Sequence, residues 1–116
     1  MTSKYQYVIA LKLIFCDSDD LSIAMRNRIN KATLLDHEDT GVGFYSTIKF
    51  SPPLEELPEV RIREFNFEHP AFPHGGSFMC WFIDANTIEI EAVTLGGANW
   101  PDHYDPDSFS EHIGSR

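Results

Sequence analysis

The sequence predicts an α+β fold, in which two N-terminal helices pack on an antiparallel sheet of about five strands. Two observations predict it. Apolar residues recur every three to four positions near the N-terminus, and further along they alternate with polar residues at every second position. The chain has 116 residues, of which 42% are hydrophobic and 13% aromatic. This length and composition indicate one globular domain over residues 1–116.

Residues 5–15 carry the first helical pattern. Their apolar positions follow the i, i+3, i+4, i+7, i+8 spacing of a buried helix face: Tyr7, Ala10, Leu11, Ile14 and Phe15. Tyr, Val and Ile also favour sheets, so a strand is the alternative. A bilayer span needs about 20 apolar residues. Because this segment is shorter, contains Lys12 and lacks a small-residue cleavage site, we expect neither a membrane span nor a signal peptide.

A second helix is expected after residues 16–20. Asp17 or Ser18 can cap its N-terminus, and the acidic residues that follow suit the positive end of the helix dipole. One side of this helix is apolar, with Leu21, Ala24, Met25 and Ile29.

Alternating residues predict the next strands. We expect strands at 33–36, 44–50 and 60–68, separated by a proline-rich loop at 51–59 and followed by another loop at 69–76. The Gly-Val-Gly segment before the second strand lacks the third glycine of a dinucleotide-binding motif. It indicates a bend or a close backbone approach instead.

A hairpin is expected at the centre of the sheet. Residues 77–83 are almost wholly apolar, which predicts a strand buried on both faces. Residues 87–95 alternate, which predicts a strand with one buried face. The second face of the sheet carries Tyr45, Glu89 and Glu91, and we expect it to be solvated or to form an interface.

An acidic tail, residues 102–116, follows the Trp100–Pro101 anchor. Phe109 and Ile113 are four positions apart. This spacing allows one short amphipathic turn that docks loosely on the domain.

Three short motifs stand in this order along residues 20–101. They are Thr-Gly-Val-Gly-Phe at 40–44, a hairpin strand that ends in an aspartate turn at 76–84, and Gly-Ala-Asn-Trp-Pro at 97–101. The order resembles a family of small bacterial proteins with no assigned biochemical function. The chain departs from that pattern at Ala85 and Ala92, where the family has glycine. The resemblance implies the order of the elements and supplies no catalytic residues.

The formal charge is −9, from 18 acidic and 9 basic residues. An acidic surface argues against nucleic acid as the partner, because phosphate binding needs concentrated Lys and Arg. It is compatible with a basic protein partner, with a metal, or with solubility alone. Cys16 and Cys80 lie in apolar surroundings and far apart, which favours buried free thiols in a cytoplasmic protein and leaves a disulfide as the alternative.

Few residues are arranged for chemistry. The metal-ligand candidates lie in two loops and match no zinc signature: His69, His74, Asp102, His103 and Asp105. Glu89 and Glu91 are about 7 Å apart by strand geometry. That spacing permits acid–base catalysis, but an exposed acidic strand face is the ordinary explanation. We identify no catalytic residues and expect no cofactor.

The small size, the acidic charge and the lack of a catalytic set favour a non-enzymatic protein-binding domain. One version is an inhibitor or immunity-type protein that neutralises a basic toxin. The expected partner contacts are the acidic face and the aromatic loop end, with Tyr45, Glu89, Glu91, Phe72, Trp100 and Tyr104. The alternatives are a small metal-dependent hydrolase that uses the His/Asp set, and a homodimer whose function lies in the assembly.

Overall fold

The computed structural model describes residues 6–114. The helices come first: α1 (Gln6–Ile14), α2 (Asp20–Arg26) and a short 3-10 helix, η1 (Ile29–Lys31). The strands follow: β1 (Thr33–Asp39), β2 (Gly43–Lys49), β3 (Ile62–His69), β4 (Phe72–Asp84), β5 (Thr87–Thr94) and β6 (Ser110–Glu111). The α+β prediction is confirmed, with six strands in the described residues where about five were expected.

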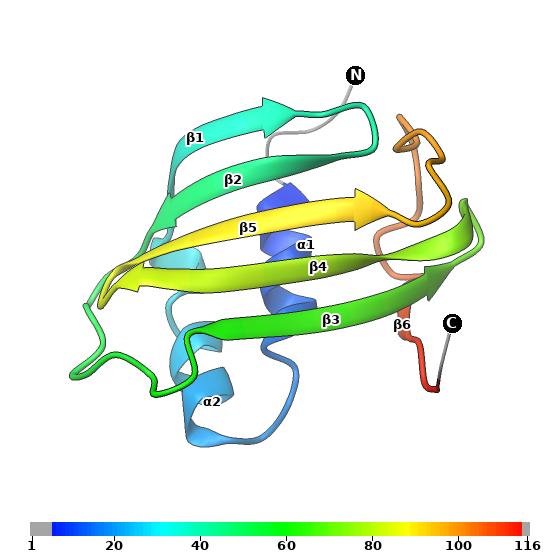
Figure 1. Cartoon of the computed structure of the whole chain (residues 1–116). Coiled ribbons are helices and arrows are strands. Elements are labelled where there is room, and N and C mark those ends of the chain that lie inside the picture. The colour runs from blue at the N-terminus through cyan, green and yellow to red at the C-terminus, as the bar shows by residue number, and fades with distance from the viewer. Residues whose placement is uncertain (1–5, 115–116) are drawn as a thin grey trace.

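All the strands form one antiparallel sheet in the order β1-β2-β5-β4-β3-β6. The predicted β4–β5 hairpin lies at its centre. Both α-helices lie behind the sheet, and no helix or strand within residues 6–114 covers its other side (Figure 1). The core therefore lies between the helices and one face of the sheet.

The helix prediction for the N-terminal segment is confirmed from Gln6 onward, while residue 5 lies outside the described residues. The buried residues of α1 are the predicted face together with the first helical residue: Gln6, Tyr7, Ala10, Leu11 and Ile14. This helix contacts β3, β4 and β5. Burying one large apolar side chain stabilises a fold by about 1.5–3 kcal/mol, and the helical spacing buries several of them on one side of α1.

The second helix is capped by Asp19, not by the predicted Asp17 or Ser18. The Asp19 carboxylate accepts hydrogen bonds from the Ser22 amide and from its hydroxyl, at 3.4 and 2.5 Å. It also pairs with Arg63 of β3 at 3.1 Å. The Ser22 hydrogen bond first, and then Arg63, lower the pKa of Asp19 to about 2. The cap thereby fastens α2 to the sheet.

Two strands differ from the prediction by three or more residues at one end, and the other predicted strands differ by one or two. β1 continues to Asp39, and β4 begins at Phe72, so residues 72–76 are strand where a loop was expected. A turn of only two residues, 70–71, joins β3 to β4, and the Ala71 amide donates to Nδ1 of His69 at 2.9 Å. A register shift beside His69 lets the ladder absorb the prolines and glycines that suggested a loop.

The expectation that residues 77–83 are buried on both faces is wrong. Phe78, Cys80 and Phe82 are at most 3% exposed and belong to the core. Their neighbours Met79 and Trp81 are only half-buried, and Ile83 is 47% exposed. The reason is that both helices cover the same face, so the alternate side chains of β4 meet no second layer.

The tail docks as an extended segment. β6 pairs with β3, and half-buried Phe109 packs against the core, whereas Ile113 is 86% exposed. The predicted amphipathic turn is therefore wrong. The Trp100 anchor is 7% exposed, and its indole N–H donates to Oε1 of Gln6 at 2.7 Å. The Tyr104 hydroxyl donates to the same oxygen.

The remaining predictions concern glycines and cysteines. A Cβ on Gly43 would lie 1.7 Å from the carbonyl oxygen of Ala92, which confirms the close backbone approach. Both cysteines are free, so the disulfide alternative is wrong. Cys80 is buried as expected, and burial raises the pKa of its thiol to about 12, but Cys16 is exposed.

Candidate interaction surface on the open face of the sheet

The side chains of the sheet that point away from the helices form one surface, which we call the open face. Residues directly opposite each other in neighbouring strands point to the same side, so the register defines its members. The paired members are Thr33, Asp36 and Glu38 (β1), Tyr45, Thr47 and Lys49 (β2), Thr87, Glu89, Glu91 and Val93 (β5), Ser77, Met79, Trp81 and Asp84 (β4), and Ile62, Glu64 and Asn66 (β3). Ile83 lies in the register shift between Phe82 and Asp84, and its place after buried Phe82 puts it on the same side.

Apolar side chains of the open face gather on β3 and β4. Trp81 lies directly opposite Ile62 of β3, which is 58% exposed. Met79 and Ile83 flank Trp81 on the same face of β4, and Ile83 is 47% exposed. Opposite residues have Cβ atoms about 4.5–5.5 Å apart, so these four side chains make one continuous apolar patch.

Acidic side chains line the neighbouring strands. In one row of the face, Trp81 is opposite Glu89; in the next, Met79 is opposite Glu91. Glu91 in turn lies opposite Tyr45 of β2, whose hydroxyl donates to Oε2 of Glu91 at 2.5 Å. The hydrogen bond to this carboxylate, and then its charge, raise the pKa of Tyr45. Apolar and acidic columns therefore run side by side.

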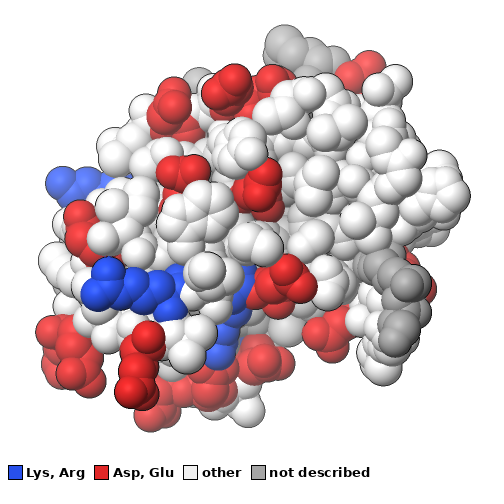
Figure 2. Space-filling model, viewed as in Figure 1, with Lys and Arg blue, Asp and Glu red and all other residues white. Residues whose placement is uncertain are grey.

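The charge of the open face is strongly one-sided. It carries six carboxylates against the single basic residue Lys49: Asp36, Glu38, Glu64, Asp84, Glu89 and Glu91. Figure 2 views the molecule from this side and shows acidic side chains spread over it, with the basic ones confined to the left half of the view. The potential in front of this face is therefore negative.

The structure divides the predicted partner contacts into two groups. Tyr45, Glu89 and Glu91 share the open face. Phe72 and Trp100 are 3% and 7% exposed and belong to the core, with ring centroids 4.8 Å apart. A partner cannot reach them in this conformation, because both side chains are buried.

Tyr104, the remaining predicted contact, lies in the same aromatic cluster. Its ring centroid is 5.6 Å from that of Phe72, and burial raises the pKa of its hydroxyl to about 12. Its hydroxyl is engaged with Gln6. Its role is therefore to anchor the tail.

The predicted metal ligands do not converge. Nε2 of His69 donates to the backbone carbonyl of Asp105 at 2.7 Å, while Nδ1 accepts from the backbone, so both ring nitrogens are occupied. The Asp105 carboxylate caps its own turn; the Ser108 hydroxyl, at 2.6 Å, is the first cause of its lowered pKa. His74, Asp102 and His103 are exposed. No group of three or more potential ligands that could hold a metal occurs in residues 6–114.

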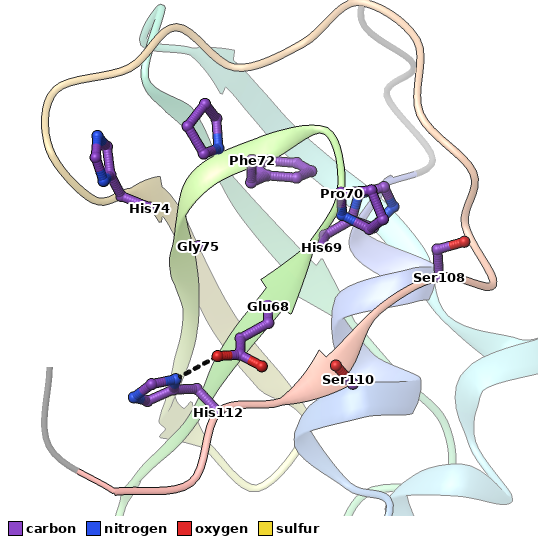
Figure 3. A pocket seen from close by; sticks show the side chains of 10 residues that line it. Glu68, His69, Pro70, Phe72, His74, Gly75, Ser108, Ser110 and His112 are labelled. Carbon is purple, nitrogen blue, oxygen red and sulfur yellow. Dashed lines mark hydrogen bonds and ion pairs between the residues drawn. The ribbon is translucent and has the colours of Figure 1, made fainter.

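A cavity of about 560 Å³ lies between the β3–β4 turn and the tail (Figure 3). On its rim Nδ1 of His112 lies 2.9 Å from Oε1 of Glu68, while Nε2 is buried and unpartnered within the described residues. A base oriented by a carboxylate also needs a nucleophile within about 3.2 Å. The Ser108 hydroxyl donates to a carboxylate of its own turn instead. Ser108 is therefore not aligned with this pair as a nucleophile.

No sequence pattern directly indicated the apolar half of the open face. Ile62, Met79, Trp81 and Ile83 were expected in the core or passed over, because a continuous apolar run is typical of a strand buried on both sides. A usable signal was present nevertheless. Alternation puts Glu89 and Glu91 on one face of β5, and the hairpin pairs them with Trp81 and Met79, which therefore share the same exposed face.

No helix within residues 6–114 is long and apolar enough to cross a membrane. No protein-family model, curated protein or solved structure matches the chain. The family resemblance based on short motifs therefore stays a prediction.

Proposed function

We propose that this protein is a non-enzymatic binding domain, of the inhibitor or immunity type, whose open face docks on a basic protein partner. The observation that carries the proposal is a whole sheet face without a covering layer, on which exposed apolar residues adjoin carboxylates. Apolar contacts at the centre of an interface supply affinity, and complementary charge supplies rate and selectivity.

Charge favours a different protein over a second copy of this chain as the occupant. A symmetric dimer through the open face would bring the same patch of each protomer together. Six carboxylates would then face six carboxylates, with one lysine on each side. Like charges placed against each other cost free energy, whereas a partner rich in Lys or Arg would gain from the same field. A homodimer through another surface stays a separate prediction.

The proposal is tested by capturing partners from the host with immobilised protein and then measuring affinity for the purified partner. We expect the wild-type affinity to fall as salt rises, because salt screens exposed charges. The double variant Glu89→Gln/Glu91→Gln removes two carboxylates from the open face. Each exposed ion pair is worth about 0.2–1 kcal/mol, so this variant should bind about ten-fold more weakly.

The matched control is Glu55→Gln/Glu56→Gln, which removes the same charge from exposed residues of the connection between β2 and β3. It should bind like wild type at moderate salt. Equal weakening by both double variants would mean that only net charge determines the affinity. That result would contradict binding through the open face.

A further inference from the structure

We propose that Trp81 and Glu89 form an arginine-selective subsite on the open face, in which a partner's guanidinium lies over the indole and pairs with the carboxylate. This inference rests on the proposed function and makes its partner more specific. A basic surface of any kind would satisfy the proposed function, whereas the subsite distinguishes arginine from lysine.

The register brings the required groups together in one row of the sheet. Trp81 has Glu89 directly opposite on one side and Ile62 on the other. Their Cβ atoms are about 4.5–5.5 Å apart. A planar cation that stacks on the indole is therefore within reach of the Glu89 carboxylate. The aliphatic stem of the same side chain can pack along exposed Ile62 and Ile83.

Both polar groups of the subsite are available. Within residues 6–114, neither the Trp81 indole nor the Glu89 carboxylate makes a hydrogen bond, and Glu89 makes no ion pair. The neighbouring acid Glu91 differs, because it accepts the Tyr45 hydroxyl. Lys49 is opposite Thr87, one row away from Glu89, and the two do not form an ion pair. An incoming guanidinium thus displaces no internal partner from Glu89.

The chain builds the same arrangement once on its covered face. The guanidinium carbon of Arg63 lies 5.6 Å from the ring centroid of Phe15, and Nη2 lies 3.1 Å from the Asp19 carboxylate. Aromatic ring, guanidinium and carboxylate are there satisfied internally. On the open face the ring and the carboxylate are present and the cation is missing.

Arginine suits this site better than lysine. Its guanidinium is flat, weakly hydrated and able to stack on an aromatic face while it donates two parallel hydrogen bonds to a carboxylate. The lysine ammonium is compact and strongly hydrated, so stacking requires it to lose more solvation. Among the aromatic side chains, tryptophan binds a cation over its face most strongly.

The test uses ¹⁵N-labelled full-length protein at low salt and three blocked pentapeptides, Gly-Val-X-Val-Gly, in which X is arginine, lysine or the neutral isostere citrulline. We expect the arginine peptide to shift the Trp81 indole N–H and the Glu89 amide. Its affinity should be about five-fold higher than that of the lysine peptide. The citrulline peptide should bind most weakly, because it stacks without charge.

Two variants locate the effect. Trp81→Leu keeps an apolar side chain but removes the ring, and Glu89→Gln keeps the shape but removes the charge; each should abolish the preference for arginine. Glu55→Gln removes a distant charge and should keep it. The dispersion of the same spectra shows whether each variant is folded, and Glu89→Gln changes only a half-exposed position.

The outcomes separate the subsite from the proposed function. Equal shifts by the arginine and lysine peptides across the open face would overturn the subsite and leave a general acidic docking face. Shifts confined to another surface, or no shift at all, would also overturn the subsite. The proposed function is judged independently, by capturing a partner and by measuring how the two double variants of this protein bind it.

Discussion

Adjacent residues of β4 should differ sharply in what they contribute to stability. Phe82 is 3% exposed and packs edge-on to Phe15 with ring centroids 6.2 Å apart. Truncating a buried Phe to Ala costs about 3–5 kcal/mol. Trp81 points to the open face, where its contacts are cross-strand pairs worth about 0.2–1 kcal/mol each. We therefore expect Trp81→Ala to cost about 1 kcal/mol, although it removes more atoms than Phe82→Ala.

Thermal unfolding followed by circular dichroism measures both variants. For 116 residues, an unfolding entropy of about 2.1 cal/mol/K per residue converts 1 kcal/mol into roughly 4 °C of melting temperature. Phe82→Ala should therefore melt more than about 10 °C below wild type, and Trp81→Ala about 4 °C below it. If Trp81→Ala cost as much as Phe82→Ala, the second face would be covered in solution and the open face would not exist.

Three further predictions concern other parts of the fold. The pKa of Asp19 is lowered to about 2 from 3.8. The ionised carboxylate therefore contributes fully to folding stability above the unfolded pKa, and this contribution is lost as pH falls through the folded pKa. Between pH 4 and 2 the urea midpoint of wild type should fall more steeply than that of Asp19→Asn. Iodoacetamide at pH 8 should label exposed Cys16 and leave Cys80 unmodified, because burial raises the pKa of that thiol to about 12; equal labelling, measured by mass spectrometry, would contradict this burial. Gln6→Ala removes the acceptor of the Trp100 indole N–H, and an unpaired buried donor costs about 1–3 kcal/mol; a variant as stable as wild type would show that the bond does not hold the tail.

Local periodicity predicted the parts of the fold whose pattern matches their surroundings. The helical stripe of α1 and the alternation of β2 and β5 each match one buried face, so the residues that point inward could be named from the sequence. The Trp100 anchor could be predicted because a tryptophan buries a large apolar area, and this one stands next to a proline after a glycine turn.

The errors arise where the sequence pattern reflects something other than burial. In β4 the apolar residues that were expected to face a second layer instead form an exposed patch, and a periodicity argument cannot separate these cases. The start of β4 was missed because Pro73 and Gly75 suggested a loop, although the register shift beside His69 accommodates them. The tail was expected as a helical turn because Phe109 and Ile113 are four residues apart, but sequence spacing alone does not require a helix. The edge of β3 was open to pairing, and β6 pairs with it as a strand.

The candidate site was predicted only in its acidic half. Tyr45, Glu89 and Glu91 were expected on the second face because alternation placed them there. Phe72 and Trp100 were expected at an aromatic loop end, yet their ring contacts with each other and with the tail bury them. Such a cluster joins segments about 30 residues apart, and no local pattern indicates that they meet.

The central claim is that a partner covers the open face and not the helices. Hydroxyl-radical footprinting of the captured complex tests it, because the reactive side chains Met79 and Trp81 lie on the open face, while exposed Cys16 lies in the connection between α1 and α2. We predict that binding reduces oxidation of Met79 and Trp81 and leaves Cys16 unchanged. Protection of Cys16 with unchanged oxidation of Met79 and Trp81 would place the partner on the helices and contradict the account.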